Sequence, residues 1–273
     1  MAIRRLLALL LLVAPACGAG VHASTDPRAV ISTLSNGDAE RLSKKRIFFG
    51  HQSVGFNVVD GLQALEKENP ALAFTIKETR DPAQVAAGVF AHTRIGQNEA
   101  PSTKIRDFTA ALEGGMAEHV DVAFFKFCYI DFDASTDAAK VFAEYKAAMT
   151  QLQQKFPRIT FVHVTTPLAV VQSGPKAAIK RLFGKKPGGA EANIVRNRYN
   201  ELLRQEYAGK QPLFDLAAFE ATRLDGARAT FDDSGSTYPM LAAEYASDGR
   251  HLNDLGSRWV AAHLVKYLAG LPL

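Results

Sequence analysis

Short apolar runs and amphipathic stretches alternate along the chain from about residue 45 onward. Nearly continuous apolar runs bounded by turn residues are typical of buried strands. Such runs occupy residues 46–49, 72–76, 120–127, 159–164 and 213–216. Apolar residues at helical spacing, closed by proline, glycine or a capping residue, predict helices. These helices are predicted over residues 54–68, 102–112, 136–156, 190–207 and 253–268. The alternation predicts an α/β domain whose parallel sheet is covered on both faces.

The connecting stretches direct attention to one edge of this sheet. Residues 79–101 predict mainly loop with a short helix over 83–90, and residues 166–190 and 220–250 predict two further long loops. Long loops in a compact domain are usually functional or disordered. In open α/β sheets, ligands bind beyond the carboxyl ends of the strands. The segments that follow strands are 50–55, 79–98, 126–131, 165–167 and 220–251.

The first residues predict export. Arg4 and Arg5 precede an apolar run over residues 6–14, which is too short for a bilayer span of about 20 residues. A basic start, a short apolar run and a small-residue cleavage site define a secretory signal. Cleavage after Ala23 fits this pattern, and a second candidate is a lipobox that would place a lipid anchor on Cys17. Both alternatives predict a periplasmic or secreted protein without a transmembrane span.

Composition and charge narrow the classes further. The chain is 47% hydrophobic and 22% charged, as in ordinary globular proteins. A formal charge of +4 without a dense basic stripe argues against nucleic acid as a partner. Only two cysteines occur, Cys17 and Cys128, and no Cys/His cluster suggests a metal site. Without repeats or long linkers, we expect a signal peptide over residues 1–23 and one domain over residues 24–273.

Ser53 stands where the first predicted strand turns into a helix, in Gly50-His51-Gln52-Ser53-Val54-Gly55. A hydroxyl at this place is exposed, and the first N–H groups of the helix point toward the same region. Serine is also a preferred helix N-cap. The position alone therefore leaves open whether Ser53 reacts or only caps the helix.

Asp248 and His251 form an Asp-x-x-His pair before the last predicted helix. A carboxylate at this spacing can hold the histidine ring in one tautomer and leave its other nitrogen as a base. One such pair carries little weight by itself. Its place after a long loop and before the last helix lets His251 reach across the strand ends to Ser53.

This combination of a serine after the first strand with Asp-x-x-His before the last helix resembles the SGNH/GDSL hydrolases. The resemblance covers roughly residues 45–268. It implies a flavodoxin-like three-layer α/β/α sandwich with a central parallel sheet of about five strands. It also implies Ser53 as the nucleophile, His251 as the base and Asp248 as the group that orients the histidine, without a metal or an organic cofactor.

The chain departs from the family pattern in two blocks. The first block usually reads Gly-Asp-Ser-Leu, and residues 50–53 read Gly-His-Gln-Ser. The third usually reads Gly-x-Asn-Asp, and residues 126–131 contain no asparagine. Losing one oxyanion donor typically costs about 2.7–4 kcal/mol of transition-state stabilisation. We therefore expect the oxyanion hole to use the N–H groups of Ser53 and Gly96, with Asn98 as the side-chain donor.

Two further residues are candidates for the substrate pocket. His51 lies beside the nucleophile, and Cys128 lies at the end of a predicted strand. Each also has a purely structural interpretation, because His51 could pack internally and an isolated cysteine is most often a small buried hydrophobe. Asn98 likewise could serve only to stabilise a turn.

The function that these residues predict is an exported serine esterase. It would cleave a small acyl ester or an acylated carbohydrate through an acyl-enzyme intermediate. One alternative is a periplasmic O-acyltransferase that passes the acyl group to envelope polysaccharide. Another is a non-catalytic glycan-binding module. Retention of all three candidate residues favours catalysis over binding alone.

Overall fold

The computed structural model describes residues 26–72 and 74–272. The predicted signal peptide, the cleavage site after Ala23 and Cys17 lie outside the described residues. Within the described part of the chain, none of the helices combines the length and the apolar character that crossing a bilayer requires.

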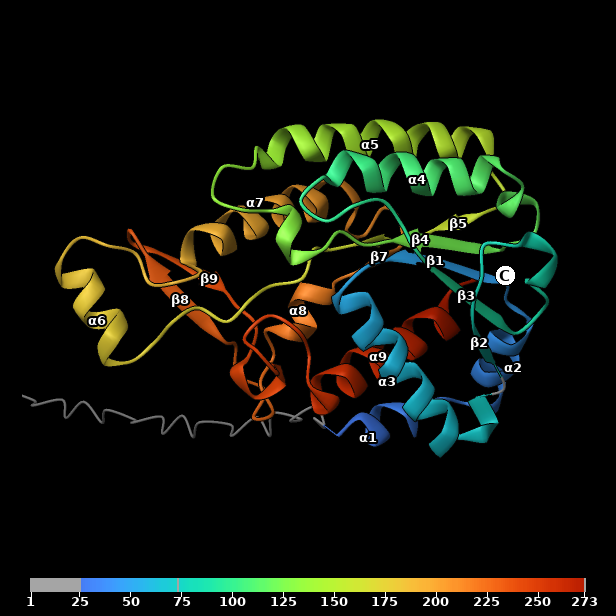
Figure 1. Cartoon of the computed structure of the whole chain (residues 1–273). Helices are drawn as coiled ribbons and strands as arrows, with labels where there is room; N and C mark the ends of the chain where they lie inside the picture. Colours follow the sequence, from blue (N-terminus) through green and yellow to red (C-terminus); the bar gives the residue numbers. More distant parts are fainter. Residues whose placement is uncertain (1–25, 73, 273) are drawn as a thin grey trace, which may run out of the picture.

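A parallel sheet of five strands, in the order β2-β3-β1-β4-β5, forms the middle layer (Figure 1). Its strands are β1 Ile47–His51, β2 Thr75–Glu78, β3 Val89–Arg94, β4 Val122–Phe125 and β5 Thr160–Phe161. The sheet continues beyond β5, because the N–H of Val162 donates to the carbonyl of Ala123 on β4. The next strand, β6, pairs in parallel with β7. These two strands are β6 His163–Val164 and β7 Leu213–Phe214.

Helices cover both faces of the sheet (Figure 1). One layer holds α4 Pro101–Glu113, α5 Ala138–Lys155 and α7 Ala190–Tyr207. The other holds α1 Pro27–Ile31, α2 Asn36–Lys44, α3 Val54–Glu68, α8 Leu216–Glu220 and α9 Asp254–Gly270. This arrangement confirms the expected three-layer α/β/α sandwich with a central parallel sheet.

The alternation of side chains along each strand divides the core in two. Phe49 stacks on Phe124 at 4.8 Å between ring centroids, toward the layer of α3 and α9. Their neighbours Phe48 and Phe125 point the other way, and both contact Phe108 of α4. All five residues of β1 are buried, as expected for a central strand with helices on both sides.

The predicted loop over residues 79–101 is wrong, because it contains the strand β3. No α-helix forms over residues 83–90, where a single 3₁₀ turn, Pro82–Gln84, precedes the strand. β3 pairs with β1 on one side and β2 on the other. Its polar residues His92 and Thr93 are buried, and they interrupted the apolar pattern that predicted the other strands.

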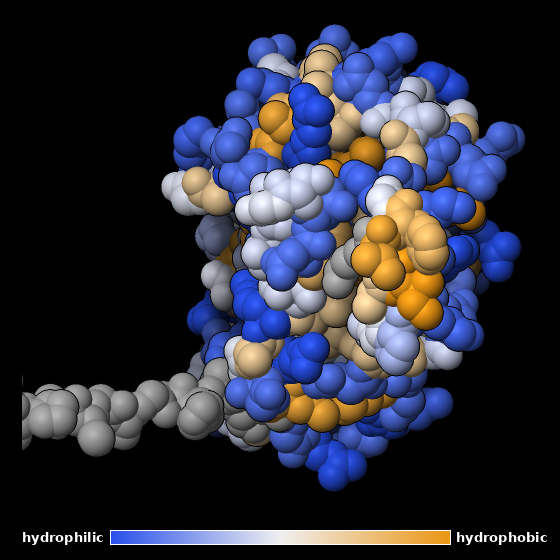
Figure 2. Space-filling model, turned by 90° about the vertical axis from the view of Figure 1, so that its left-hand side faces the viewer, coloured by the Kyte–Doolittle hydropathy of each residue, from blue (hydrophilic) through white to orange (hydrophobic). Residues whose placement is uncertain are grey.

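The two long loops contain small elements of their own. Residues 166–190 include α6 Pro175–Leu182, and residues 220–250 include an antiparallel hairpin of β8 Thr230–Asp233 and β9 Ser236–Pro239. Apolar side chains at the end of α6 are exposed: Ile179, Leu182 and Phe183. Figure 2 shows them as an apolar patch on the face of the molecule that carries α6.

The remaining short elements are single 3₁₀ turns. They are η1 Pro70–Leu72, η2 Pro82–Gln84, η3 Met116–Glu118, η4 Tyr129–Asp131 and η5 Ala243–Tyr245. The turn η4 directly follows the end of β4. It therefore lies at the carboxyl edge of the sheet, where ligands bind in this class of fold.

Candidate active site

Ser53, His251 and Asp248 form a continuous chain of hydrogen bonds. Ser53 Oγ lies 2.7 Å from His251 Nε2. His251 Nδ1 lies 2.7 Å from Asp248 Oδ2. Because an ionised carboxylate only accepts, the proton of the neutral ring is assigned to Nδ1. Nε2 is then free to accept the proton of the Ser53 hydroxyl.

The backbone of Ser53 is strained. Its φ is 51° and its ψ is −114°, and a positive φ is uncommon for a residue with a side chain. Such strain persists only where the surroundings hold it, often at functional sites. Ser53 occupies the N-cap position of α3, but its side chain makes no capping hydrogen bond. Its hydroxyl instead faces His251.

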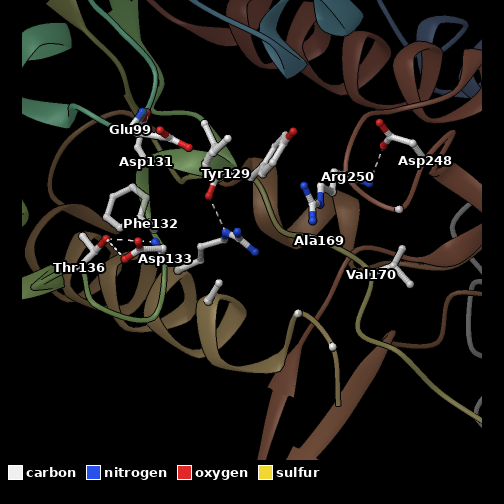
Figure 3. A pocket seen from close by; sticks show the side chains of 16 residues that line it. Glu99, Tyr129, Asp131, Phe132, Asp133, Thr136, Ala169, Val170, Asp248 and Arg250 are labelled. Carbon is white, nitrogen blue, oxygen red and sulfur yellow. Dashed lines mark hydrogen bonds between the residues drawn. The ribbon is translucent and has the colours of Figure 1, made fainter. Parts of the chain in front are cut away.

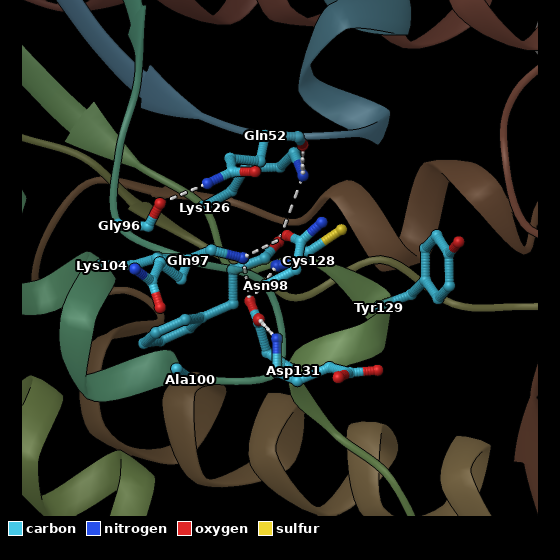
Figure 4. Close-up of polar contacts among 12 residues, drawn as sticks. Gln52, Gly96, Gln97, Asn98, Ala100, Lys104, Lys126, Cys128, Tyr129 and Asp131 are labelled. Atoms are coloured by element: carbon cyan, nitrogen blue, oxygen red, sulfur yellow. Dashed lines mark hydrogen bonds and ion pairs between the residues drawn. The ribbon is translucent and has the colours of Figure 1, made fainter.

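Gln52, the residue before Ser53, is held from two sides (Figure 4). The side-chain amide of Gln52 donates to the carbonyl of Gly96 at 2.5 Å. Lys126 Nζ donates to the main-chain carbonyl of Gln52 at 2.8 Å. Lys126 is buried, and desolvation lowers its pKa from the ordinary value. These contacts bind the turn to the ends of β3 and β4 and account for how its strain is maintained.

The loop that carries His251 is fixed by its own aspartate. Asp248 Oδ1 accepts hydrogen bonds from the backbone N–H of Arg250 at 2.9 Å and of His251 at 2.8 Å. The backbone and ring of His251 lower the pKa of Asp248 to about 2. Asp248 is therefore ionised at neutral pH. The side chain of Asn57 on α3 accepts from the N–H of Leu252 at 3.3 Å, which ties this loop to the helix that begins at Ser53.

Ser53 and His251 precede the first residues of two helices that lie against each other, α3 and α9. Gly61 makes the close approach possible, since a Cβ there would lie 2.3 Å from the carbonyl oxygen of Ser257. Asn253 caps α9 by accepting from the N–H of Gly256 at 2.9 Å, as the sequence predicted. The positive ends of both helix dipoles consequently face the site and favour negative charge there.

The expected oxyanion donors have different environments. The N–H of Ser53 stands at the start of α3, where the first amides have no intrahelical acceptor. The N–H of Gly96 donates to Asp107 Oδ2 at 2.8 Å, so a role for Gly96 would require that bond to break. Asn98 Oδ1 accepts from Lys104 Nζ at 3.0 Å, which leaves the amide nitrogen of Asn98 as its donor end.

The loop that carries Asn98 rests on a buried ion pair. Lys104 and Asp131 are both fully buried as side chains, with 2.5 Å between Nζ and Oδ2. Asp131 also accepts from the backbone N–H of Cys128 at 2.6 Å and of Glu99 at 3.0 Å. Figure 4 shows how this carboxylate joins the segment after β3 to the segment after β4.

His51 and Cys128 do not line a pocket, which corrects the expectation for both. Each is 0% exposed. His51 Nε2 lies 3.1 Å from His92 Nδ1, and the missing side chain of Gly55 leaves room for the ring. Burial lowers the pKa of His51 to about 2. Cys128 packs in the apolar core on the α3 side of the sheet.

A cleft of about 680 Å³ opens beside the loop that contains Asp248 (Figure 3). Its wall includes Tyr129, whose ring meets that of His251 edge-to-face with 5.4 Å between centroids. Arg196 and Arg250 also line it. The guanidinium carbons of these arginines lie 5.7 Å and 5.9 Å from the centre of the Tyr129 ring.

Sequence reasoning missed these three cleft residues. Arg250 lies inside the Asp-x-x-His segment, and that position was the one signal that could have identified it. Tyr129 and Arg196 come from η4 and from the middle of α7, and only the tertiary fold brings them together. Among the described residues, no group of three or more His, Cys, Asp or Glu is placed to hold a metal ion.

Comparison with known proteins finds similarity in solved structures alone. No family of known sequences matches the chain, and no curated protein is similar to it. Structural neighbours across most of the chain are SGNH/GDSL-like hydrolases and lipases. A GDSL-like lipase from Bacteroides thetaiotaomicron is 12% identical, with 89% of this chain and 97% of that chain covered and a TM-score of 0.49.

Two other neighbours have different descriptions. The periplasmic domain of a lipopolysaccharide acetyltransferase from Salmonella ser. Paratyphi A is 12% identical, with 88% of each chain covered and a TM-score of 0.39. The C-terminal domain of the Drosophila Oskar protein is 11% identical, with 80% of this chain and 84% of that chain covered and a TM-score of 0.36. The activity of this chain therefore has to be argued from its own site.

Proposed function

We propose that this protein is an exported serine esterase of the SGNH type. The observation that carries the proposal is the chain of two 2.7 Å hydrogen bonds from Ser53 through His251 to Asp248. The strained turn at Ser53 supports it, as does the nearby cleft, whose residue Tyr129 contacts His251. Export is supported by the sequence of the first 23 residues.

The first half of the reaction forms an acyl-enzyme. Ser53 Oγ attacks the ester carbonyl carbon while its proton passes to His251 Nε2. The ionised Asp248 stabilises the imidazolium that results. The oxyanion of the tetrahedral intermediate is stabilised by the N–H of Ser53 and the positive end of α3, with Asn98 as the side-chain donor. As the carbon–oxygen bond to the alcohol breaks, the alcohol leaves with the proton from His251.

The second half returns the free serine. His251 Nε2 takes a proton from water, whose oxygen attacks the acyl carbon. The bond to Ser53 Oγ then breaks, the serine regains its proton from His251, and the carboxylic acid leaves. An O-acyltransferase would use a sugar hydroxyl in place of this water. The size of the cleft favours this as the second candidate, since about 680 Å³ is ample for a saccharide-sized ligand.

The test compares residues 24–273 with two serine variants in the hydrolysis of 4-nitrophenyl acetate and butyrate. Ser53→Ala should lower kcat by at least about 10³-fold. Ser234→Ala is the matched control, because Ser234 also has a φ of 51° and lies in the turn of the β8–β9 hairpin. Full activity in a folded Ser53→Ala variant would refute the proposal.

A native enzyme that is inactive on both esters would move the question to the alternatives. Addition of a sugar acceptor with an activated acyl donor then separates them. An acylated sugar that forms only with Ser53 present indicates the transferase. Glycan binding without acylation, equal in the native protein and Ser53→Ala, indicates a binding module.

A further inference from the structure

We propose that the cleft binds a carboxylate of the substrate between Arg196 and Arg250, across the Tyr129 side chain from the reacting ester. The preferred substrates are then acyl esters that also carry a carboxylate group. The statement that the substrate is an ester rests on the proposed esterase function. The binding of the carboxylate can be tested without turnover.

Arg196 is a buried cation without an anionic partner among the described residues. Only 6% of the residue is exposed. Its Nε donates to the carbonyl of Tyr129 at 2.8 Å, and its Nη1 donates to the side chain of Asn193 at 3.1 Å. Buried charges are normally paired, because removing them from water is costly. Nη2 makes no hydrogen bond within the described chain and is not shut off from solvent, so it remains open to the cleft.

The nearby acid does not neutralise Arg196. Glu220 is fully buried and accepts from the N–H of Leu168 at 2.7 Å. Burial raises the pKa of Glu220 to about 8, and its other oxygen has no partner. Glu220 is therefore largely protonated at neutral pH. Burial, followed by the positive charge of Arg250, lowers the pKa of Arg196 to about 10, so Arg196 itself stays charged.

Arg250 brings a second positive charge to the same place. Its backbone is fixed by Asp248, but its guanidinium has no carboxylate within ion-pair distance in the described part of the chain. Like Arg196, it lies within 6 Å of the centre of the Tyr129 ring. Two cations that face one cleft repel each other until an anion enters between them. Neither Ser53 nor His251 lines the cleft, but the Tyr129 ring that both arginines approach also contacts His251. This anion would therefore be separated from the reacting atoms by the Tyr129 side chain.

The charged side chains along the rest of the cleft determine how the ligand is oriented. Glu99 and Asp133 line the opposite side from Arg250 (Figure 3). Asp248 also lines the end near His251, where its carboxylate accepts from His251 Nδ1. The two arginines still leave this end with a net positive charge, whereas the other end is negative, which disfavours a polyanion along the whole cleft. Arginine is suited to carboxylates, because its planar fork of N–H donors matches their two oxygens. One carboxylate at the positive end fits this distribution.

The carboxylate can belong to either half of the ester, and two pairs of substrates distinguish these sources. For the acyl half, mono-4-nitrophenyl succinate is compared with 4-nitrophenyl butyrate. For the alcohol half, O-acetylated methyl glucuronoside is compared with O-acetylated methyl glucoside. The native enzyme should show a kcat/KM about 10- to 100-fold higher for the carboxylate-bearing member of at least one pair, from the strength of hydrogen bonds to charged groups. Equal values within both pairs would overturn the inference.

The variants assign the preference to the arginines. Arg250→Gln, which alters an exposed side chain, should remove most of the preference for the carboxylate-bearing member. Arg196→Gln should do the same, with circular dichroism to verify that it folds. Arg198→Gln is the matched control, because Arg198 is exposed on the same helix α7 and should keep the preference. A preference that survives in Arg250→Gln and Arg196→Gln would contradict the assignment.

A binding measurement covers the case in which no ester is cleaved. Calorimetric titration of the Ser53→Ala variant with glucuronate, succinate and glucose measures carboxylate binding without catalysis. Binding of either carboxylate but not of glucose, lost on adding Arg250→Gln, supports the inference even if the esterase proposal fails. Failure of both carboxylates to bind, with no substrate preference, overturns it.

Discussion

Replacing Gly61 by alanine should separate the two helices that carry Ser53 and His251. A Cβ at position 61 would lie 2.3 Å from the carbonyl oxygen of Ser257 and 2.9 Å from the Cβ of Ala261. Close carbon–oxygen contacts are ordinarily about 3.3–3.6 Å. The obstacle is the backbone of α9, which cannot turn away like a flexible side chain. The helices must therefore move apart by about 1 Å.

Two magnitudes follow from this displacement. Overpacking of a core typically costs about 1–3 kcal/mol of the free energy of unfolding, and alanine recovers up to about 1 kcal/mol through its helix propensity. At this chain size, each kcal/mol lowers Tm by about 2–4 °C. Because α9 begins just after His251, the shift also alters its position relative to Ser53. A misplacement of 1 Å can lower the rate by about 10²-fold.

Thermal unfolding and ester hydrolysis measure the two effects separately. The control is Gly270→Ala, since Gly270 ends α9 and a Cβ there would meet no heavy atom within 4 Å. We expect Gly61→Ala to lower both Tm and kcat/KM. Gly270→Ala should leave both values unchanged. A Gly61→Ala variant with native Tm and native activity would refute the argument that this contact sets the distance between the helices.

Three further predictions concern the acidic residues. Asp248→Asn should lower kcat by up to about 10⁴-fold with little change in Tm, because the Asp248 side chain is 55% exposed; a kcat within tenfold of native would contradict its role. Asp131→Ala should lower the free energy of unfolding, measured in urea, by about 3–5 kcal/mol, because it leaves the buried Lys104 without its partner. A much smaller loss in the free energy of unfolding, as for substitution of an exposed residue, would contradict this. In folded Glu220, burial raises the pKa from 4.5 to about 8, so the folded state holds a proton that the unfolded state releases. The free energy of unfolding should therefore fall as pH rises from about 4.5 to about 8. Glu220→Gln should reduce this pH dependence; an unchanged pH dependence would show that it comes from other titratable groups.

The sequence predicted the fold best where local signals agreed with tertiary packing. The helices predicted over residues 54–68 and 190–207 are Val54–Glu68 and Ala190–Tyr207. The buried face of Val54–Glu68 is apolar. The buried face of Ala190–Tyr207 combines apolar residues with three asparagines and Arg196. The strand Val89–Arg94 was missed because its central residues are polar. It is stable because it is paired with a neighbour on each side, and a local window does not contain those neighbours.

In the candidate site too, some residues could be predicted from the sequence and others could not. Ser53 and His251 were identified because chain topology places strand ends and helix starts together at one edge of a parallel sheet. His51 is two residues from Ser53, but it belongs to β1, and the alternation of strand side chains directs it into the core. Tyr129 and Arg196 are 67 residues apart, and no spacing rule connects them. Nearness in sequence was therefore a poor guide to nearness in the cleft.

The proposed esterase would take its oxyanion side chain from a different strand end than the third family block predicts. The segment after β4 begins with Lys126, whose ammonium donates to the carbonyls of Gln52 and Phe127. Lys126 therefore holds the turn before Ser53. Asn98, on the loop after β3, accepts a hydrogen bond from Lys104 Nζ, and its side-chain amide is the oxyanion donor that we propose. Asn98 follows β3 and Lys126 follows β4, the two strands that lie on either side of β1. A motif search confined to the third block cannot find Asn98, because Asn98 belongs to another segment of the chain. The strand order shows that this segment lies at the same edge of the sheet.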